Sequence, residues 1–434
     1  MFDYFKLFLK KLLPKQMKKV LVKMHLELKN FKFWLILQLL KDRAFIKSLT
    51  QVIIANKYGI RKFVNIEFIN TKYPEKMQYI FKQQTPLFYS PPKFNSLKCE
   101  NNRLTKVNDH HNYVGILNDT VITGGSNLII LDSQNVLYDL KKYDLNHRFK
   151  YNDEGLIFYK KDFCLIKNKD SNTSFKAAIF MGGNFSWNYY HLLYEILIKF
   201  EQIDALNLDS NIPILVDKIC FEVPQYFELF AILNKKERKL IPLQKSEQYR
   251  INKLYYFSSP NFIPPNFINE NDIRPEDILF DINSLEYLRN NLRPHSSKKV
   301  FPKRLYISRS KASGRRQFNE LDVFKILEKY DFETILPENY SIPDQISMFS
   351  NAEYIVGGSG AAFTNLIYCK KNCKVIIFAK NELSFSGFST ISSFVGNELI
   401  YFTEEKYSKD LNIHAPFIID TIKFDKFLTE WISL

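Results

Sequence analysis

Three polar residues at the start of one helical pattern have a spacing that suits proton transfer. Asn188, His191 and Glu195 lie three and four residues apart, so an α-helix would place them on one face. The apolar residues between Leu192 and Phe200 fall on another face, which leaves the polar row free to line a cleft. A histidine titrates near neutral pH, so His191 could take a proton from a hydroxyl, with Glu195 orienting the imidazole or acting as the base itself. The alternative is a histidine near a helix start that is satisfied by a backbone carbonyl.

A second group of residues is suited to binding a diphosphate. Arg309 ends an apolar run typical of a strand, and a planar guanidinium can donate two parallel hydrogen bonds to a phosphate. A turn at Gly357–Gly360 joins another such run to a helical pattern, where glycines allow close backbone approach and a helix N-terminus offers unpaired N–H groups. We expect the phosphate contacts to come from Arg309, Gly358, Ser359, Gly360, Ala361, Thr364 and Asn365. Support could come from Arg315 and Arg316, for which a solvated basic loop is the alternative.

Other motifs that bind phosphate or metal are missing from the sequence. The glycine turn lacks the Lys-Ser/Thr end of a Walker A loop and is not a clean G-x-G-x-x-G. No two aspartates lie two residues apart, and Cys369 and Cys373 have no second pair of ligands for zinc. We therefore expect no metal and no cofactor, so arginines, backbone N–H groups and a helix dipole must neutralise the diphosphate.

The elements that must position these residues alternate between strand and helix patterns, which is typical of an α/β fold with parallel strands. The first block predicts strands at 177–181, 212–216, 239–243 and 254–258, with helices at 186–200 and 223–233. The second block predicts strands at 304–308, 332–336, 352–356 and 374–378, followed by a terminal helix at 421–431. Residues 50–170 are typical of mixed short strands and loops, and 260–275 of a linker between the blocks. Ligands of open α/β sheets bind at the carboxyl ends of the strands, so both groups of residues should line one cleft.

The net charge of +15 is concentrated near the N-terminus. Residues 1–50 hold twelve Lys and Arg against three acidic residues, so +9 of the +15 lies there. The remaining +6 is unremarkable for 384 residues, which argues against nucleic acid as a partner. Bases alternate with bulky apolar residues in this segment, which favours an amphipathic helix on an anionic membrane surface, with packing on its own domain as the alternative. Its apolar runs are shorter than the roughly 20 residues of a spanning helix.

The expected compartment follows from the cysteines and from the N-terminal pattern. Five cysteines are few for 434 residues and do not form a regular even set. No secretory signal pattern is evident. We therefore expect a cytoplasmic protein, peripheral on the inner face of the cell membrane.

The order of several motifs resembles glycosyltransferase family 61. The motifs are Asn188–Glu195, Tyr306–Arg309, Asn319-Glu320, Leu336–Glu338, Asp344–Ile346, Phe349–Ala352 and Val356–Asn365. The resemblance covers about residues 180–379 and adds Asn188, Glu338 and Gln345 as supporting site residues. Many members carry histidine where this chain has Ser359, so a role for that histidine does not carry over.

The resemblance implies a GT-B-like α/β fold, in which two Rossmann-like domains face each other across a cleft, here with a basic helical extension at the N-terminus. We expect a basic segment at 1–50, an acceptor-side domain at 51–260, a nucleotide-sugar-binding domain at 273–411 and a terminal helix at 412–434. The implied activity is inverting, metal-independent transfer of a sugar, a hexose or a pentose, from a nucleotide sugar to a glycan or lipid-linked acceptor. Bacterial members are linked to capsular polysaccharide and lipopolysaccharide synthesis.

Two other functions remain open at this point. One is a catalytically degenerate protein that binds sugar or polymer on the same fold, as the serine at position 359 would permit. The other is a nucleic-acid-binding module that uses the basic N-terminus, which predicts steeply salt-dependent binding.

Overall fold

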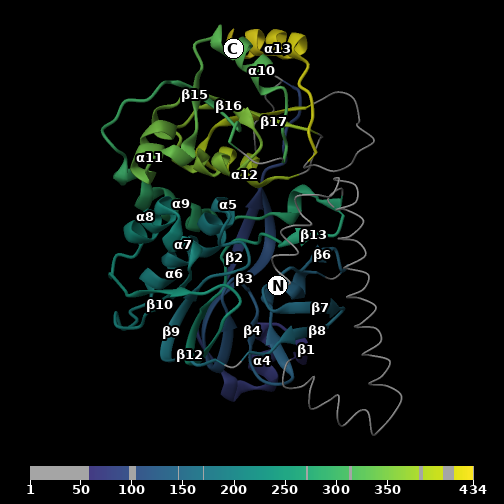
Figure 1. Cartoon of the computed structure of the whole chain (residues 1–434), viewed down its shortest axis with the longest axis vertical. Helices are drawn as coiled ribbons and strands as arrows, with labels where there is room; N and C mark the ends of the chain where they lie inside the picture. Colours follow the sequence, from purple (N-terminus) through teal and green to yellow (C-terminus); the bar gives the residue numbers. More distant parts are fainter. Residues whose placement is uncertain are drawn as a thin grey trace, which may run out of the picture.

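The computed structural model describes residues 58–96, 104–144, 146–169, 171–269, 272–311, 315–380, 385–403 and 415–433. The basic segment 1–50 and the expected domain boundary near residue 412 lie outside the described residues. The described chain is mixed α/β, with an 11-stranded sheet in the lower part of Figure 1 and a 5-stranded sheet in the upper part. None of its helices is both long and apolar enough to cross a membrane.

The large sheet combines a parallel and an antiparallel half. Its strands are β1 (Tyr58–Val64), β2 (Met77–Tyr89), β3 (Thr105–Thr123), β4 (Ile129–Ile130), β5 (Asn135–Leu137), β7 (Leu156–Lys160), β8 (Phe163–Lys167), β9 (Ser174–Met181), β10 (Ile214–Asp217), β11 (Leu240–Leu243) and β12 (Gln248–Phe257). Strands β11, β10, β9 and β12 run parallel in that order, as the βαβ pattern predicts. Strand β12 then pairs antiparallel with β3, so the parallel strands continue into one mixed sheet.

The long hairpin β2–β3 differs from the short strands and loops expected for residues 50–170. Its strands span 13 and 19 residues. Their pairing has register irregularities between Tyr79 and Phe81 and between Thr85 and Leu87, which interrupt the alternation of apolar and polar residues that marks a strand. Beyond β2 the chain reaches the other sheet, where Asn95 exchanges two 2.8 Å hydrogen bonds with Thr403.

The small sheet is parallel throughout, with the strand order β15-β14-β16-β17-β18 among the described residues. Its strands are β14 (Arg304–Ile307), β15 (Glu333–Ile335), β16 (Tyr354–Gly358), β17 (Lys374–Ala379) and β18 (Glu398–Thr403). The four strands predicted for this block are confirmed within one or two residues. A separate two-stranded pair joins β6 (Phe149–Lys150) to β13 (Asn266–Phe267).

Helices cover both sheets and meet between them. They are α4 (Ile66–Lys72), α5 (Tyr189–His191), α6 (Phe200–Ala205), α7 (Ile219–Glu222), α8 (Pro224–Leu233), α9 (Ile282–Leu292), α10 (Glu320–Glu328), α11 (Ile342–Asn351), α12 (Gly387–Val395) and α13 (Thr421–Ser433). In Figure 1, α5, α8 and α9 lie at the level between the two sheets.

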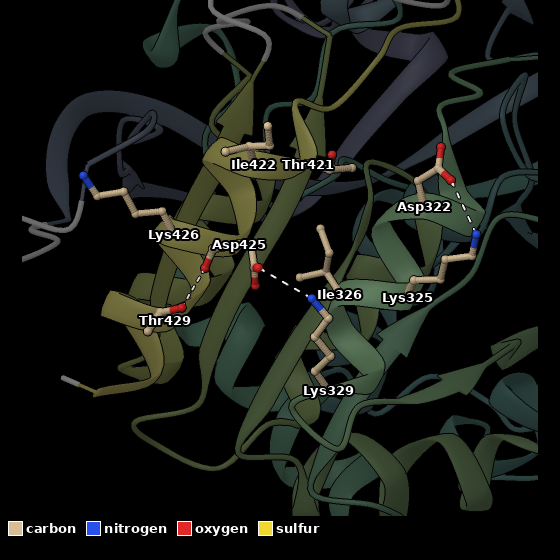
Figure 2. Close-up of a pocket in the computed structure, with 9 residues that line it drawn as sticks. All are labelled: Asp322, Lys325, Ile326, Lys329, Thr421, Ile422, Asp425, Lys426 and Thr429. Atoms are coloured by element: carbon tan, nitrogen blue, oxygen red, sulfur yellow. Dashed lines mark hydrogen bonds and ion pairs between the residues drawn. The ribbon is translucent and has the colours of Figure 1, made fainter.

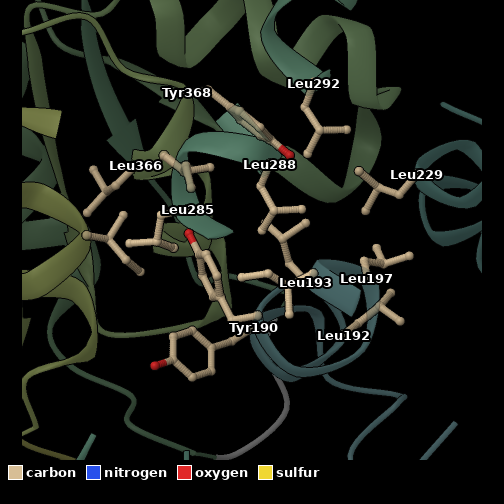
Figure 3. Packing of buried hydrophobic residues seen from close by; sticks show 14 of the residues in the cluster. Tyr190, Leu192, Leu193, Leu197, Leu229, Leu285, Leu288, Leu292, Leu366 and Tyr368 are labelled. Atoms are coloured by element: carbon tan, nitrogen blue, oxygen red, sulfur yellow. The ribbon is translucent and has the colours of Figure 1, made fainter. Parts of the chain in front are cut away.

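One hydrophobic cluster joins the two parts of the molecule. It contains Leu192 and Leu193 from the histidine-bearing helix, Leu285 and Leu288 from α9, and Leu366 from the segment after the glycine turn (Figure 3). All five are buried, and apolar burial stabilises by about 25 cal/mol per Å². Within the described residues the two parts are therefore packed together on a shared core, and the GT-B arrangement stays a prediction.

The stretch 260–275, predicted as a linker, is partly buried. Residues 260–265 are buried between β12 and α9. The Asn261 side chain donates to the Tyr194 carbonyl at 2.8 Å and accepts from the Asp281 N–H at 2.9 Å. This stretch thus packs into the structure and bonds to the helix that carries Tyr194 and to the residue before α9.

Candidate active site

His191 and Glu195 are in direct contact, as their spacing predicts. The imidazole Nδ1 of His191 bonds Oε1 of Glu195. When Nδ1 donates to a carboxylate, Nε2 becomes the nitrogen that can accept a proton. The Phe185 ring stacks on the imidazole at a centroid distance of 4.6 Å and an interplanar angle of 24°. The carboxylate and the stacked ring therefore hold the imidazole in place, and its role as a base stays a prediction.

The helix that carries this pair is irregular. The predicted helix 186–200 begins at Tyr189, becomes π-helical at Leu192–Ile196 and 3₁₀-helical at Leu197–Lys199. Such π-helical turns occur frequently at functional sites. Asn188 does not share the polar face; it is the N-cap, and its side chain accepts from the Tyr190 N–H at 3.0 Å.

A buried aspartate, Asp217, anchors the turn before this helix. Its carboxylate accepts the Gly183 N–H at 2.8 Å and the Gly125 N–H at 2.7 Å. Burial raises the pKa of Asp217, and the two backbone bonds counteract that effect. The sequence analysis did not single out Asp217, although an aspartate directly after the buried strand 212–216 is a signal that could have found it.

A cavity of about 80 Å³ opens beside the pair. It lies at the carboxyl ends of the parallel strands β9 and β12, where α/β sheets bind ligands. His191, Glu195 and Lys199 line it from the helix, and Ser258 and Asn261 line it from the segment after β12. The sequence analysis also missed Lys199, which continues the polar row one turn beyond Glu195.

Arg309 lies two residues after the end of β14 and packs against the glycine turn. Its N–H bonds Oε1 of Glu320 at 2.9 Å, and its Nη2 donates to the Arg315 carbonyl at 3.1 Å. Its buried Nε has no hydrogen-bond partner among the described residues. Burial lowers the pKa of Arg309, and Glu320 counteracts that effect. A buried donor without a partner is costly, which is consistent with a ligand that binds it.

The glycine turn leaves room for this guanidinium. A Cβ at Gly358 would lie 2.7 Å from Cδ of Arg309, and a Cβ at Gly360 would overlap Nη1. Arg316 donates to Oγ of Ser359 at 3.2 Å, which brings a second guanidinium to the same turn. The segment that follows, Ala361–Tyr368, is a 3₁₀-helix, whereas the sequence pattern indicated only a helix.

Some donors of the predicted phosphate site are already occupied. The Ser359 N–H donates to the Phe378 carbonyl at 2.9 Å. Asn365 is buried, accepts from the Tyr189 hydroxyl at 2.7 Å and donates to Oε1 of Gln345 at 2.8 Å. Thr364 is also buried, and its carbonyl accepts from the Tyr194 hydroxyl at 2.9 Å. Asn365 and Gln345 thus brace the histidine helix against the glycine turn.

The remaining predicted residues lie around Arg309. Ala361 is partly buried at the start of the 3₁₀-helix, Arg315 is exposed and offers its carbonyl to Arg309, and Glu338 is exposed. The charge of Glu338 raises the pKa of Arg309 slightly against the effect of burial. The phosphate-binding roles of these residues stay predictions.

A larger hollow elsewhere does not fit the chemistry of either group. It measures about 570 Å³ and lies between α10 and α13 (Figure 2). Lys329 pairs with Asp425 at 3.7 Å and Lys325 with Asp322 at 4.0 Å along its wall. Neither His191 nor Arg309 lines this hollow, so we do not assign the site to it.

Comparison with known proteins identifies a family for part of the chain. A search of curated proteins found no match to the chain. Residues 189–376 match the family described as Glycosyltransferase 61, and this range contains His191, Glu195, Arg309 and the glycine turn. Within the described part of the chain, no three His, Cys, Asp or Glu side chains are grouped to hold a metal ion. The match confirms the resemblance: residues 189–376 carry a glycosyltransferase family 61 domain, which supports a transferase activity.

Proposed function

We propose that the protein transfers a sugar from a nucleotide sugar to an acceptor hydroxyl with inversion at the anomeric carbon. The observation that carries the proposal is the contact between the two groups of residues. Tyr189, two residues before His191, donates to Asn365 of the glycine-turn segment at 2.7 Å. The helix of His191 therefore touches the segment that follows the glycine turn, and Arg309 packs against that turn, which supports one shared site for displacement.

On the acceptor side, His191 is the base. Its Nε2 takes the proton from the acceptor hydroxyl as the oxygen attacks the anomeric carbon, and Glu195 holds the ring through Nδ1. The new C–O bond forms opposite the bond to the diphosphate, which breaks with both electrons. Inversion follows from this single displacement.

On the donor side, Arg309 binds the leaving diphosphate. Its Nε is a donor without a partner among the described residues, and the glycine turn gives the guanidinium room to lie against the backbone. Arg316, which bonds Ser359 at 3.2 Å, supplies a second positive charge beside the turn. Positive groups at this position stabilise the charge that develops on the leaving group, and we propose that they do so without a metal ion.

We further propose that the acceptor is a glycan or a lipid-linked sugar in surface polysaccharide synthesis. The basis is the family and the basic, apolar composition of residues 1–50, which suits attachment to the inner face of the cell membrane. Vesicle sedimentation with and without residues 1–50, using vesicles of phosphatidylglycerol, tests the attachment. Equal binding of both forms would contradict it.

The activity is tested with a panel of UDP-, GDP- and dTDP-sugars and p-nitrophenyl glycosides as acceptors. We expect one donor to be consumed with release of its nucleoside diphosphate, in the presence of EDTA, and NMR of the product to show the inverted anomer. CMP-sugars, which lack a diphosphate, are the matched control and should not react. Binding of a donor without transfer or hydrolysis would instead support a non-catalytic sugar-binding protein.

A further inference from the structure

Lys199 is a partly buried cation that the proposed mechanism does not use. It follows Glu195 by four residues and His191 by eight, and all three line the cavity of about 80 Å³. The change from π- to 3₁₀-helix at residue 197 accompanies this arrangement. The cavity therefore has a proton acceptor at one position and an ammonium group at another on the same helix.

The ammonium of Lys199 makes no hydrogen bond or ion pair with another residue of the described ranges, and only the charge of Glu195 acts on it from nearby. Burial lowers the pKa of Lys199 to about 8, and Glu195 counteracts this effect. Lys199 is thus mostly charged at neutral pH. A partly buried charge without a hydrogen-bond partner in the protein is unfavourable, so a ligand that bonds it would explain its position.

Volume and charge limit what this ligand can be. A volume of about 80 Å³ accommodates several water-sized groups, so a sugar substituent fits. The carboxylates of Glu195 and Asp139 also line the cavity, and Glu195 offsets the lysine charge. An anionic substituent would meet both carboxylates, whereas a hydroxyl can accept from the ammonium and donate to an acid or amide.

We propose that this cavity is the acceptor subsite and that Lys199 binds a hydroxyl of a neutral sugar adjacent to the hydroxyl that His191 deprotonates. This inference rests on the proposed function and specifies its acceptor. Ser258 and Asn261 also line the cavity, but their side chains already bond Asn112 and the Tyr194 carbonyl, so Lys199 and the histidine pair supply the polar contacts. Lys199 keeps its proton throughout the reaction: it donates a hydrogen bond and favours negative charge on the attacking oxygen, whose own proton goes to Nε2 of His191.

Direct binding tests the subsite without knowledge of the natural acceptor. The probes are the methyl glycosides of glucose, galactose, mannose, N-acetylglucosamine and rhamnose, measured by saturation-transfer NMR on the full chain. We expect at least one to bind wild-type protein and to bind Lys199→Met about tenfold or more weakly, since a hydrogen bond to a charged group is lost. Lys253→Met, on an exposed position of β12, is the matched control and should bind as wild type does.

The chemistry of the contact is tested with deoxy analogues of the glycoside that binds. Removing the hydroxyl that Lys199 contacts should weaken binding to wild-type protein and have little further effect in Lys199→Met, as a double-mutant cycle requires for a direct contact. Lys199→Arg keeps a charged donor and should retain part of the binding. Equal loss of binding in both proteins on removal of each hydroxyl would overturn the proposal.

Thermal unfolding separates this role from a loss of fold. Lys199 loses its proton near pH 8 when folded and near its ordinary value of about 10.5 when unfolded, so wild-type stability should rise with pH across that window. Lys199→Met lacks this effect. It should be more stable than wild type at pH 7, with a difference that shrinks above pH 8.

The outcomes distinguish this inference from the proposed function. Glycoside binding that depends on Lys199, without sugar transfer from any donor, would retain the subsite and reject the transferase mechanism. Sugar transfer with equal glycoside binding in wild type and Lys199→Met would reject the subsite alone. Failure of all five glycosides to bind wild-type protein would also overturn the subsite.

Discussion

The two groups of functional residues occupy equivalent places in two different sheets. His191, Glu195 and Lys199 lie beside the carboxyl ends of β9 and β12, and Arg309 and the glycine turn lie after β14 and β16. The first place presents titratable side chains around a small cavity. The second presents a guanidinium and closely approaching backbone. In the proposed mechanism the same topological position serves proton transfer in one sheet and anion binding in the other, because the loops after the strands differ.

The supports of the two places differ as well. Asp217 holds two glycine turns through backbone N–H groups beside the histidine, whereas Glu320 holds the backbone of Arg309. The bond between Tyr189 and Asn365 connects the two places directly. If the comparison is correct, substitutions on one side should change catalysis and those on the other should change nucleotide binding.

The largest expected effect is on the histidine side. His191→Ala should lower the transfer rate by about 10² to 10⁴, the usual contribution of a general base, with little change in nucleotide binding. Glu195→Gln should lower the rate less, because the imidazole remains. Initial rates with the accepted donor test this, and calorimetry with its nucleoside diphosphate is the control. Full activity of His191→Ala would make Glu195 the candidate base.

Arg309 should give the next largest effect, on binding. Arg309→Ala should weaken binding of the nucleoside diphosphate by roughly 10- to 100-fold, because charge-assisted hydrogen bonds are lost. The affinity of Arg309→Lys should lie between those of the wild type and Arg309→Ala, since lysine keeps the charge but not the planar fork. Isothermal titration calorimetry measures both, with the exposed Arg250→Ala in the other sheet as the matched control. Unchanged affinity would remove Arg309 from the site.

Gly360 and Gly357 make room for different groups. Gly360 makes room for the Arg309 guanidinium, and Gly357 for the adjacent strand. Gly360→Ala should displace the flexible end of Arg309 and weaken nucleotide binding several-fold, with little loss of stability. Gly357→Ala would place a Cβ 2.6 Å from the Ile307 carbonyl oxygen in the adjacent strand, so it should destabilise by about 1–3 kcal/mol. Thermal melts of both variants measure the loss of stability, and nucleotide titrations measure the loss of binding. The reverse pattern would contradict the assigned geometry.

The smallest expected effect is at the connection between the two places. Tyr189→Phe removes the bond to Asn365 and should lower the free energy of unfolding by about 1 kcal/mol. Tyr194→Phe, which loses the bond to the Thr364 carbonyl, is the matched comparison at the same contact. Urea unfolding measures both. A large loss of nucleotide affinity in Tyr189→Phe would instead show that Asn365 binds the donor.

The parallel strands were predictable because each is a short apolar run followed by a turn and a helical pattern. Strand β16, for example, ends in two glycines that the sequence shows directly. The hairpin β2–β3 was not predictable in the same way, since its register irregularities hide the period of two. The helix 186–200 was predicted as one α-helix, because local pattern does not distinguish an α-helical turn from a π-helical one.

The residues of the candidate site also differ in how far local sequence predicts them. The pair His191 and Glu195 follows from local spacing, and Arg309 follows from its place at the end of a strand. Lys199 and Asp217 have only weak local signals, the polar row and the end of a strand, and the fold distinguishes them from other lysines and aspartates through their surroundings.

The sequence by itself determined the α/β alternation, the family and the two groups of residues with suitable chemistry, since these depend on residues close together in the chain. Only the tertiary structure decided that Asn365 braces the histidine helix, that Gly358 and Gly360 make space for Arg309, and that Lys199 faces the same cavity as His191. Those relations join residues on different strands and helices. Packing of the shared core sets their distances, and no local pattern records it.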